Sequence, residues 1–224
     1  IHSMSYIDAL YKKDEDKIYV VERDPKKGRV FVEYDARYVF YYPDARGKHR
    51  SITGETLQKV TCATSKEFIK EQRIRSNKAL YEQDINPVFR CLEENYLGKE
   101  TPKLNVLFFD IEVDFDPERG YATTDDPFMP ITAISCYMGW TDQLVTFAVP
   151  PKTLSMKDAE ILTKRFPNTL LFEKEKDMLD AFLQVVDEAD ILSGWNSEGY
   201  DIPYTVGRIQ KTMSSDDTRR LCFW

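Results

Sequence analysis

The sequence lacks several features that would assign it to a common class. It has no run of eighteen or more apolar residues, the length that a membrane-spanning helix needs. We also expect no secretion signal, because no charged segment followed by an apolar one is present. No internal repeat or low-complexity tract occurs. The four cysteines are Cys62, Cys91, Cys136 and Cys222, and they form no Cys-x-x-Cys pair. We therefore expect idle or buried thiols in a reducing cytoplasm rather than a zinc site.

The composition that is present belongs to a folded chain. With 42% hydrophobic residues the chain can bury a core, and 224 residues allow one large domain or two small ones. The net charge of −7 argues against a general nucleic-acid binder. The charge is uneven, since residues 1–103 hold 20 Lys and Arg against 17 Asp and Glu, whereas residues 104–224 hold 11 against 21. The acidic second part suits cation binding.

Periodicity and turn signals divide the chain near residues 98–103. Before that boundary we expect a β-rich domain, residues 1–103, with two helices, the first capped by Ser65. The expected elements there are strands at 17–22, 29–34 and 38–42, and helices at 65–82 and 87–96. After it, residues 104–224 open with strands and continue with helix, strand and helix. The expected elements are strands at 104–113, 131–140, 143–149, 169–173 and 190–193, and helices at 175–189 and 202–211.

Two carboxylates end the first strand of the second region. Asp110 and Glu112 close the nearly apolar run LNVLFFDIEV, and residues two apart on a strand share a face. Like charges about 4 Å apart cost on the order of 4 kcal/mol at an effective dielectric of ~20. A divalent cation would offset that cost, because Mg²⁺ prefers carboxylate oxygens. The alternative is a strand that ends in an exposed turn, since Asp114 and Asp116 follow.

Another acidic residue follows the last short apolar strand. Residues 191–201 read ILSGWNSEGYD, and Asp201 falls where a helix could start, with Pro203 in its first turn. The alternative role for Asp201 is therefore an N-cap. We expect Trp195, like Trp140, to be a core residue.

These two acidic segments resemble the first and second exonuclease motifs of family B DNA polymerases. Here the motifs read Asp110-Ile111-Glu112 and Asn196-Ser197-Glu198-Gly199-Tyr200-Asp201. A third stretch, LYEQDINPVFRCLEENY at residues 80–96, is similar to the segment that precedes the first motif in that family. The wording of the second motif looks closest to the tailed-bacteriophage branch. Three matches in the family's order, covering residues 80–208, are more specific than any one of them.

The resemblance implies a fold and a chemistry. The expected fold is α/β (α+β), a ribonuclease H-like exonuclease fold that is incomplete and follows the smaller β-rich domain. The implied chemistry is 3′–5′ proofreading hydrolysis of DNA at a site with two Mg²⁺ or Mn²⁺ ions, one on each side of the phosphorus. Asp110, Glu112 and Asp201 would be the catalytic metal ligands. Asn196 and Tyr200 would lie beside the single-stranded 3′ end of DNA, although Tyr200 has a core aromatic as its alternative.

The family's third exonuclease motif, Tyr-x-x-x-Asp, does not occur after Asp201, because Tyr204 is followed four positions on by Arg208. The palm motifs are absent too. We therefore expect the amino-terminal part of a DNA-directed DNA polymerase, from a cloned fragment or a split gene. Its protein partner would be the remainder of the polymerase. The expected location is the cytoplasm, or the host cytoplasm if a phage encodes the chain, and no membrane is expected as a partner. Ile1–Ser3 are interpreted as an expression remnant.

Two other functions stay open. The chain could be a non-catalytic nucleic-acid-binding or structural module of a split polymerase, which would bind metal poorly without the third motif. It could also be a stand-alone exonuclease of the DEDD type, named for its four acidic residues. The β-rich region before the first motif argues against this last option, because such nucleases often begin near that strand.

Overall fold

The computed structural model describes residues 5–100 and 102–224, so the interpreted expression remnant lies outside the described residues. The chain divides into two compact units, with the division between Lys103 and Leu104. We call them the first and the second unit.

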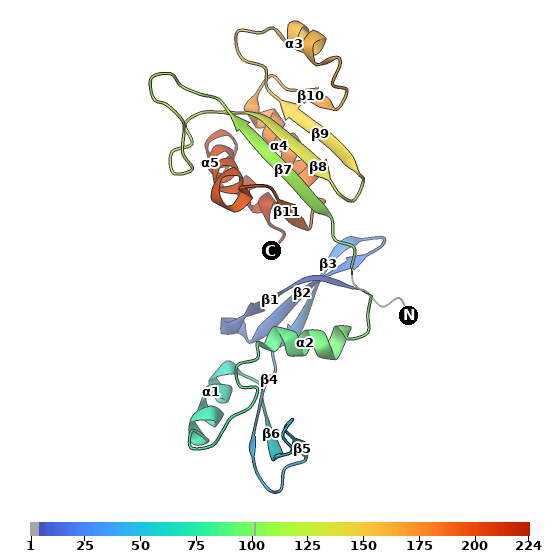
Figure 1. Cartoon of the computed structure of the whole chain (residues 1–224), viewed down its shortest axis with the longest axis vertical. Coiled ribbons are helices and arrows are strands. Elements are labelled where there is room, and N and C mark those ends of the chain that lie inside the picture. The colour runs from blue at the N-terminus through green and yellow to red at the C-terminus, as the bar shows by residue number, and fades with distance from the viewer. Residues whose placement is uncertain (1–4, 101) are drawn as a thin grey trace. The chain divides into compact units, whose positions relative to one another are not determined.

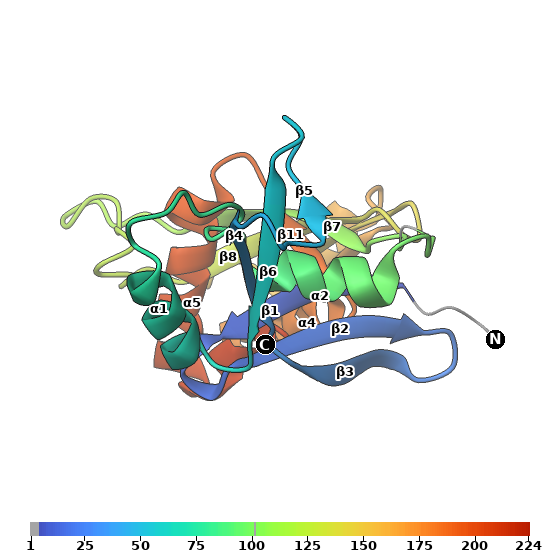
Figure 2. The same cartoon turned by 90° about the horizontal axis from the view of Figure 1, so that it is seen from below.

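The first unit contains two three-stranded antiparallel sheets (Figure 1). One has the strand order β1-β2-β3, formed by Tyr6–Lys12, Lys17–Asp24 and Gly28–Asp35. The other has the order β4-β6-β5, formed by Tyr38–Pro43, Thr56–Cys62 and His49–Arg50. Helix α1 (Ser65–Ile74) packs on β4 and β6, and α2 (Pro87–Tyr96) runs alongside β1 and β2, as Figure 2 also shows.

The strands expected from residue 17 to residue 42 and the helix at 87–96 are confirmed, but the helix expected at 65–82 is wrong beyond Ile74. Helix α1 buries none of its residues, and Ile74 is 61% exposed, so no packing supports further turns. The cap is also not Ser65: the Thr64 hydroxyl accepts a hydrogen bond from the Glu67 N–H at 3.2 Å. Strands β1, β5 and β6 were not predicted.

The second unit is built on one five-stranded mixed sheet with the order β10-β9-β8-β7-β11. Its strands are β7 (Val106–Val113), β8 (Ile131–Met138), β9 (Gln143–Ala148), β10 (Thr169–Leu171) and β11 (Ile191–Ser193). Strands β7, β8 and β9 are antiparallel, whereas β10 and β11 run parallel to their neighbours. The helices are α3 (Met156–Thr163), which was not predicted, α4 (Glu175–Val186) and α5 (Ile202–Thr212).

The core of the second unit lies between the sheet and α4. Leu107, Phe109 and Ile111 of β7 are buried on that side, and the Phe109 ring lies 5.3 Å from the ring of Phe182 on α4. The expected α/β class is therefore confirmed. Among the described residues, no helix has both the length and the apolar character to span a membrane. The cysteines are free thiols and three are buried; burial raises the pKa of Cys136 to about 12, so this thiol is inert.

Candidate active site

Strand β7 carries Asp110 and Glu112 on its exposed face, because its residues alternate between solvent and core. Phe109 and Ile111, the neighbours on the buried face, anchor the strand. The β7–β8 ladder shifts register between Glu112 and Val113. Such a bulge bends a strand and re-aims side chains, and bulges are frequent beside active sites.

The segment that follows β11 continues along the edge of β7. Strand β11 pairs in parallel with the start of β7 and ends at Ser193, opposite Phe108. At the next residue, Gly194, an added Cβ would lie 2.5 Å from the carbonyl oxygen of Phe109. Backbone cannot move away as a flexible side chain can, so this close approach requires glycine.

Asp201 reaches the same edge one step further along β7. Its Oδ1 accepts a hydrogen bond from the backbone N–H of Ile111 at 3.4 Å. Ile111 is the residue between Asp110 and Glu112, so the structure brings Asp201 to the strand position that carries the two other predicted ligands. The N-cap alternative for Asp201 is wrong, because its side chain makes no cap hydrogen bond and its backbone is already helical, with φ −60° and ψ −47°.

The turn that carries Asp201 into place is a single turn of π-helix, Ser197–Asp201. Such turns are rare and occur frequently at functional sites. Within it, a Cβ on Gly199 would lie 2.6 Å from Oδ1 of Asn196. The absence of a side chain at this glycine therefore leaves room for the Asn196 carboxamide.

The predicted nucleic-acid contacts differ in exposure. Asn196 is exposed, whereas Tyr200 is half-buried and stacks on Tyr204 with the ring centroids 5.3 Å apart. Tyr200 also packs against the core, which agrees with its alternative role as a core aromatic, and its contact with DNA stays a prediction. The prediction that Trp195 is a core residue is wrong, because Trp195 is fully exposed in the loop after β11. Trp140 does pack against the core.

Asp201 is a buried carboxylate in an unfavourable setting. It is 4% exposed, and burial raises its pKa above the ordinary value of 3.8. The negative charge of Asp110 raises the pKa further, while the Ile111 N–H acts in the opposite direction. The groups that shift this pKa include no Lys or Arg.

This donor set fits a hard divalent cation, because carboxylate oxygens are the ligands that Mg²⁺ and Mn²⁺ prefer and because a cation would stabilise ionised Asp201. Within residues 5–100 and 102–224, however, no three His, Cys, Asp or Glu side chains converge at distances suited to one ion. The structure thus joins Asp201 to the β7 backbone, and the three-carboxylate ligand set remains a prediction.

Replacing Asp201 by asparagine is expected to stabilise the metal-free chain at pH 7 by about 0.5–2 kcal/mol, as removal of a functional-site penalty commonly does. The folded-state pKa of Asp201 is raised, so the folded chain binds more protons than the unfolded one just above pH 3.8. The wild type therefore loses stability as the pH rises through the raised pKa, and Asp201→Asn does not. Urea unfolding at pH 7 and pH 3.5 measures this, and a less stable variant at pH 7 would contradict it.

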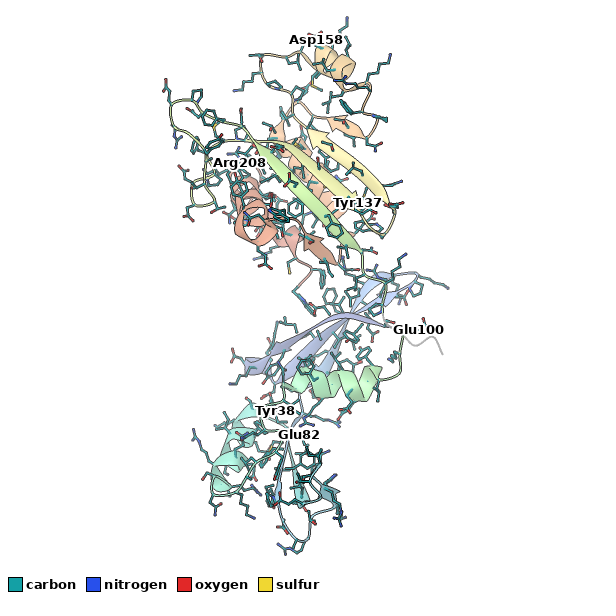
Figure 3. All side chains as sticks on the ribbon, in the orientation of Figure 1. Tyr38, Glu82, Glu100, Tyr137, Asp158 and Arg208 are labelled. Atoms are coloured by element: carbon teal, nitrogen blue, oxygen red, sulfur yellow. The ribbon has the colours of Figure 1, made fainter. Side chains whose placement is uncertain are left out.

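Sequence reasoning missed a buried ion pair next to this site, between Arg208 of α5 and Glu175 of α4. Both side chains are 10% exposed, and Figure 3 labels Arg208 on α5. The sequence contained the spacing of the helix face that carries Arg208, but neither its burial nor the partner of Arg208. Asp201, Tyr204, Thr205 and Arg208 are spaced i, i+3, i+4 and i+7, the pattern of one helix face, and all four are buried although none is aliphatic.

Comparison with known proteins finds a matching family model and related polymerases. The family model described as DNA polymerase family B, exonuclease domain, matches residues 49–222. The DNA-directed DNA polymerase of Escherichia phage RB69 is 26% identical over 214 residues, which covers 85% of this chain and 24% of that protein. The DNA polymerase delta catalytic subunit of Plasmodium falciparum (isolate K1 / Thailand) is 27% identical over 166 residues, or 70% of this chain and 14% of that protein.

The fold has a relative among solved structures. The family B DNA polymerase from the hyperthermophilic archaeon Pyrobaculum calidifontis matches with a TM-score of 0.58 and 17% identity, over 92% of this chain and 32% of that one. At this identity the match speaks for the fold alone, which agrees with the expected ribonuclease H-like class. The chain spans 24% and 14% of the length of the two curated relatives. On the family match, which covers most of its residues, the chain belongs to the family B DNA polymerases and carries sequence of their exonuclease domain.

Proposed function

We propose that this chain is the amino-terminal part of a DNA-directed DNA polymerase and supplies acidic residues of its 3′–5′ proofreading exonuclease. The observation that carries the proposal is the contact of Asp201 with the Ile111 amide, between Asp110 and Glu112. These residues come from motifs that are 90 positions apart in the chain. Burial and the charge of Asp110 raise the pKa of Asp201, and a bound cation would stabilise its ionised form, which supports a role as a metal ligand.

In this proposal Asp110, Glu112 and Asp201 hold two Mg²⁺ or Mn²⁺ ions. The ions would supply a water activated for attack and charge neutralisation at the leaving oxygen. The protein's own contribution is to fix the carboxylates: β7 orients Asp110 and Glu112 on one face, and the Ile111 N–H orients Asp201. A fixed geometry lowers the entropy cost of reaching the reactive arrangement.

The substrate in this proposal is the single-stranded 3′ end of DNA. Exposed Asn196 lies in the loop that leads to Asp201, and Trp195 next to it presents a fully exposed aromatic ring. Aromatic rings stack on any base, so such contacts tolerate every sequence, as proofreading requires. The remainder of the polymerase would be the protein partner, and the cytoplasm, or that of an infected host, the location.

The isolated chain is expected to show weak or no nuclease activity, because its 224 residues contain no Tyr-x-x-x-Asp after Asp201. Incubation with labelled single-stranded DNA and Mn²⁺ measures this. Rapid trimming that depends on Asp110 would show instead that the chain is catalytically self-sufficient.

Metal binding tests the proposed function directly. Mn²⁺ titration of the chain, followed by electron paramagnetic resonance, should reveal binding that Asp110→Asn and Asp201→Asn each weaken by about tenfold or more. Glu198→Gln is the matched control, because Glu198 is an exposed carboxylate in the same turn. Equal Mn²⁺ binding in all variants, together with metal-independent DNA binding, would favour the non-catalytic binding module.

A further inference from the structure

The ion pair between Arg208 and Glu175 joins α5 to α4, two of the three α-helices of the second unit. Nε of Arg208 donates to Oε1 of Glu175 at 2.8 Å, and Nη2 donates to the other carboxylate oxygen. Such a bidentate interaction fixes the orientation of the two side chains as well as their distance, because the guanidinium is planar and rigid. The pair therefore links one face of α5 to the start of α4 in a defined orientation.

The same pair also holds the segment that leads from β7 to β8. Nη1 of Arg208 donates to the carbonyl oxygen of Pro127 at 2.9 Å. Oε1 of Glu175 accepts a second hydrogen bond from the backbone N–H of Ile131 at 2.8 Å. Ile131 opens β8, the strand paired with β7, so the ion pair connects both helices to the strands that carry the acidic site.

Two further contacts of α5 leave little room for movement. The Tyr204 hydroxyl donates to the carbonyl oxygen of Met129 at 2.7 Å. A Cβ on Gly207 would lie 2.5 Å from Cγ of Pro127, so the helix backbone approaches the segment closely. Rotation or sliding of α5 would break these contacts together with the ion pair.

We propose that Arg208 and Glu175 form a positioning pair, which sets the rotation and register of α5 and so holds the Asp201 carboxylate at the Ile111 amide. Asp201 precedes Arg208 by seven residues, about two helical turns, so both lie on the same face of the helix. Neither member of the pair is a proposed metal ligand. The consequence for metal binding rests on the proposed function, whereas the mechanical link between the pair and Asp201 is measured separately.

The first measurement is hydrogen–deuterium exchange of the Ile111 amide, whose hydrogen bond goes to Asp201. The Asp110 amide serves as internal reference for the fold, because Asp110 pairs with Ser135 in the β7–β8 ladder. Arg208→Lys keeps the positive charge but cannot form the bidentate hydrogen bond to Glu175. In this variant we expect the Ile111 amide to exchange about tenfold faster and the exchange rate of the Asp110 amide to stay unchanged. Asp201→Ala should accelerate Ile111 in the same way.

The matched control is Arg220→Lys. Arg220 also bonds two carboxylates of the α4 region, Asp180 and Asp187, each at 2.9 Å. Among the hydrogen bonds of the described residues, none of those made by Arg220 reaches the segment before β8. This variant should leave both amides as in the wild type. If Arg208→Lys loses protection at both amides, or if it leaves Ile111 unchanged, the pair is not a positioning device and the proposal is wrong.

A double variant, Glu175→Met with Arg208→Met, guards against a folding defect, because apolar replacement of a buried pair often keeps the fold. It too should expose Ile111 selectively. The second measurement is Mn²⁺ affinity, which should fall by about 10- to 100-fold in Arg208→Lys. Every variant in which the Ile111 amide exchanges faster should show the same weakened Mn²⁺ binding. A wild type that binds no Mn²⁺ would refute the proposed function, while the exchange result would still decide the positioning role.

Discussion

In a family B polymerase that contains this chain, Asp110→Ala is expected to lower 3′–5′ exonuclease activity by about 10³-fold and to leave nucleotide addition within about twofold. Asp110 sits on the exposed face of β7, with its buried neighbours Phe109 and Ile111 holding the strand. Its loss would remove a proposed carboxylate ligand without opening the core. A 10³-fold loss corresponds to about 4 kcal/mol, the scale expected for losing metal-based charge stabilisation.

Degradation of a labelled single strand and extension of a primed template measure the two activities on the same preparation. Glu198→Gln should leave both activities unchanged, because the Glu198 carboxylate is exposed. Among the hydrogen bonds of the described residues, the one that reaches Ile111 of β7 from this turn comes from Asp201, not from Glu198. An equal loss of both activities in Asp110→Ala would mean that Asp110 is structural.

Much of the second unit could be predicted because its periodicity is strong. The apolar runs of β7 and β8 and the amphipathic α4 appear at the expected places with small differences at their ends. The common face of Asp110 and Glu112 follows from strand alternation alone. The likeness to the second exonuclease motif marked Asp201, but the sequence contained no sign of its contact with a backbone amide.

The failures have a physical pattern. The helix expected at residues 65–82 carried a partial apolar stripe, yet a stripe forms a long helix only where a partner surface buries it, and α1 buries nothing. Trp195 was expected in the core, but it follows Gly194, where the chain leaves the sheet, and its side chain is fully exposed. The Arg208–Glu175 pair joins residues 33 positions apart, a long-range relation that local patterns do not contain.

The energetics of that pair support a second large prediction. Arg208→Met alone is expected to cost about 3–5 kcal/mol of unfolding free energy, because it leaves the Glu175 carboxylate buried without its charged partner. Glu175→Met combined with Arg208→Met should cost clearly less than the sum of the two single changes. Urea unfolding, fitted with one shared m-value, measures the unfolding free energies of Arg208→Met, Glu175→Met and the double variant.

The double variant is still expected to fall short of wild-type stability. It leaves the Pro127 carbonyl and the Ile131 N–H without the partners they have in the native chain, at about 1–3 kcal/mol for each buried group. Arg220→Met, which breaks a more exposed pair, should cost no more than about 1 kcal/mol. If the two single changes at Arg208 and Glu175 are simply additive, the pair contributes no coupling, and α5 must be held by its other contacts, such as the Tyr204 hydrogen bond to Met129. If they are strongly coupled, the same interaction that stabilises the unit also fixes the helix that carries Asp201.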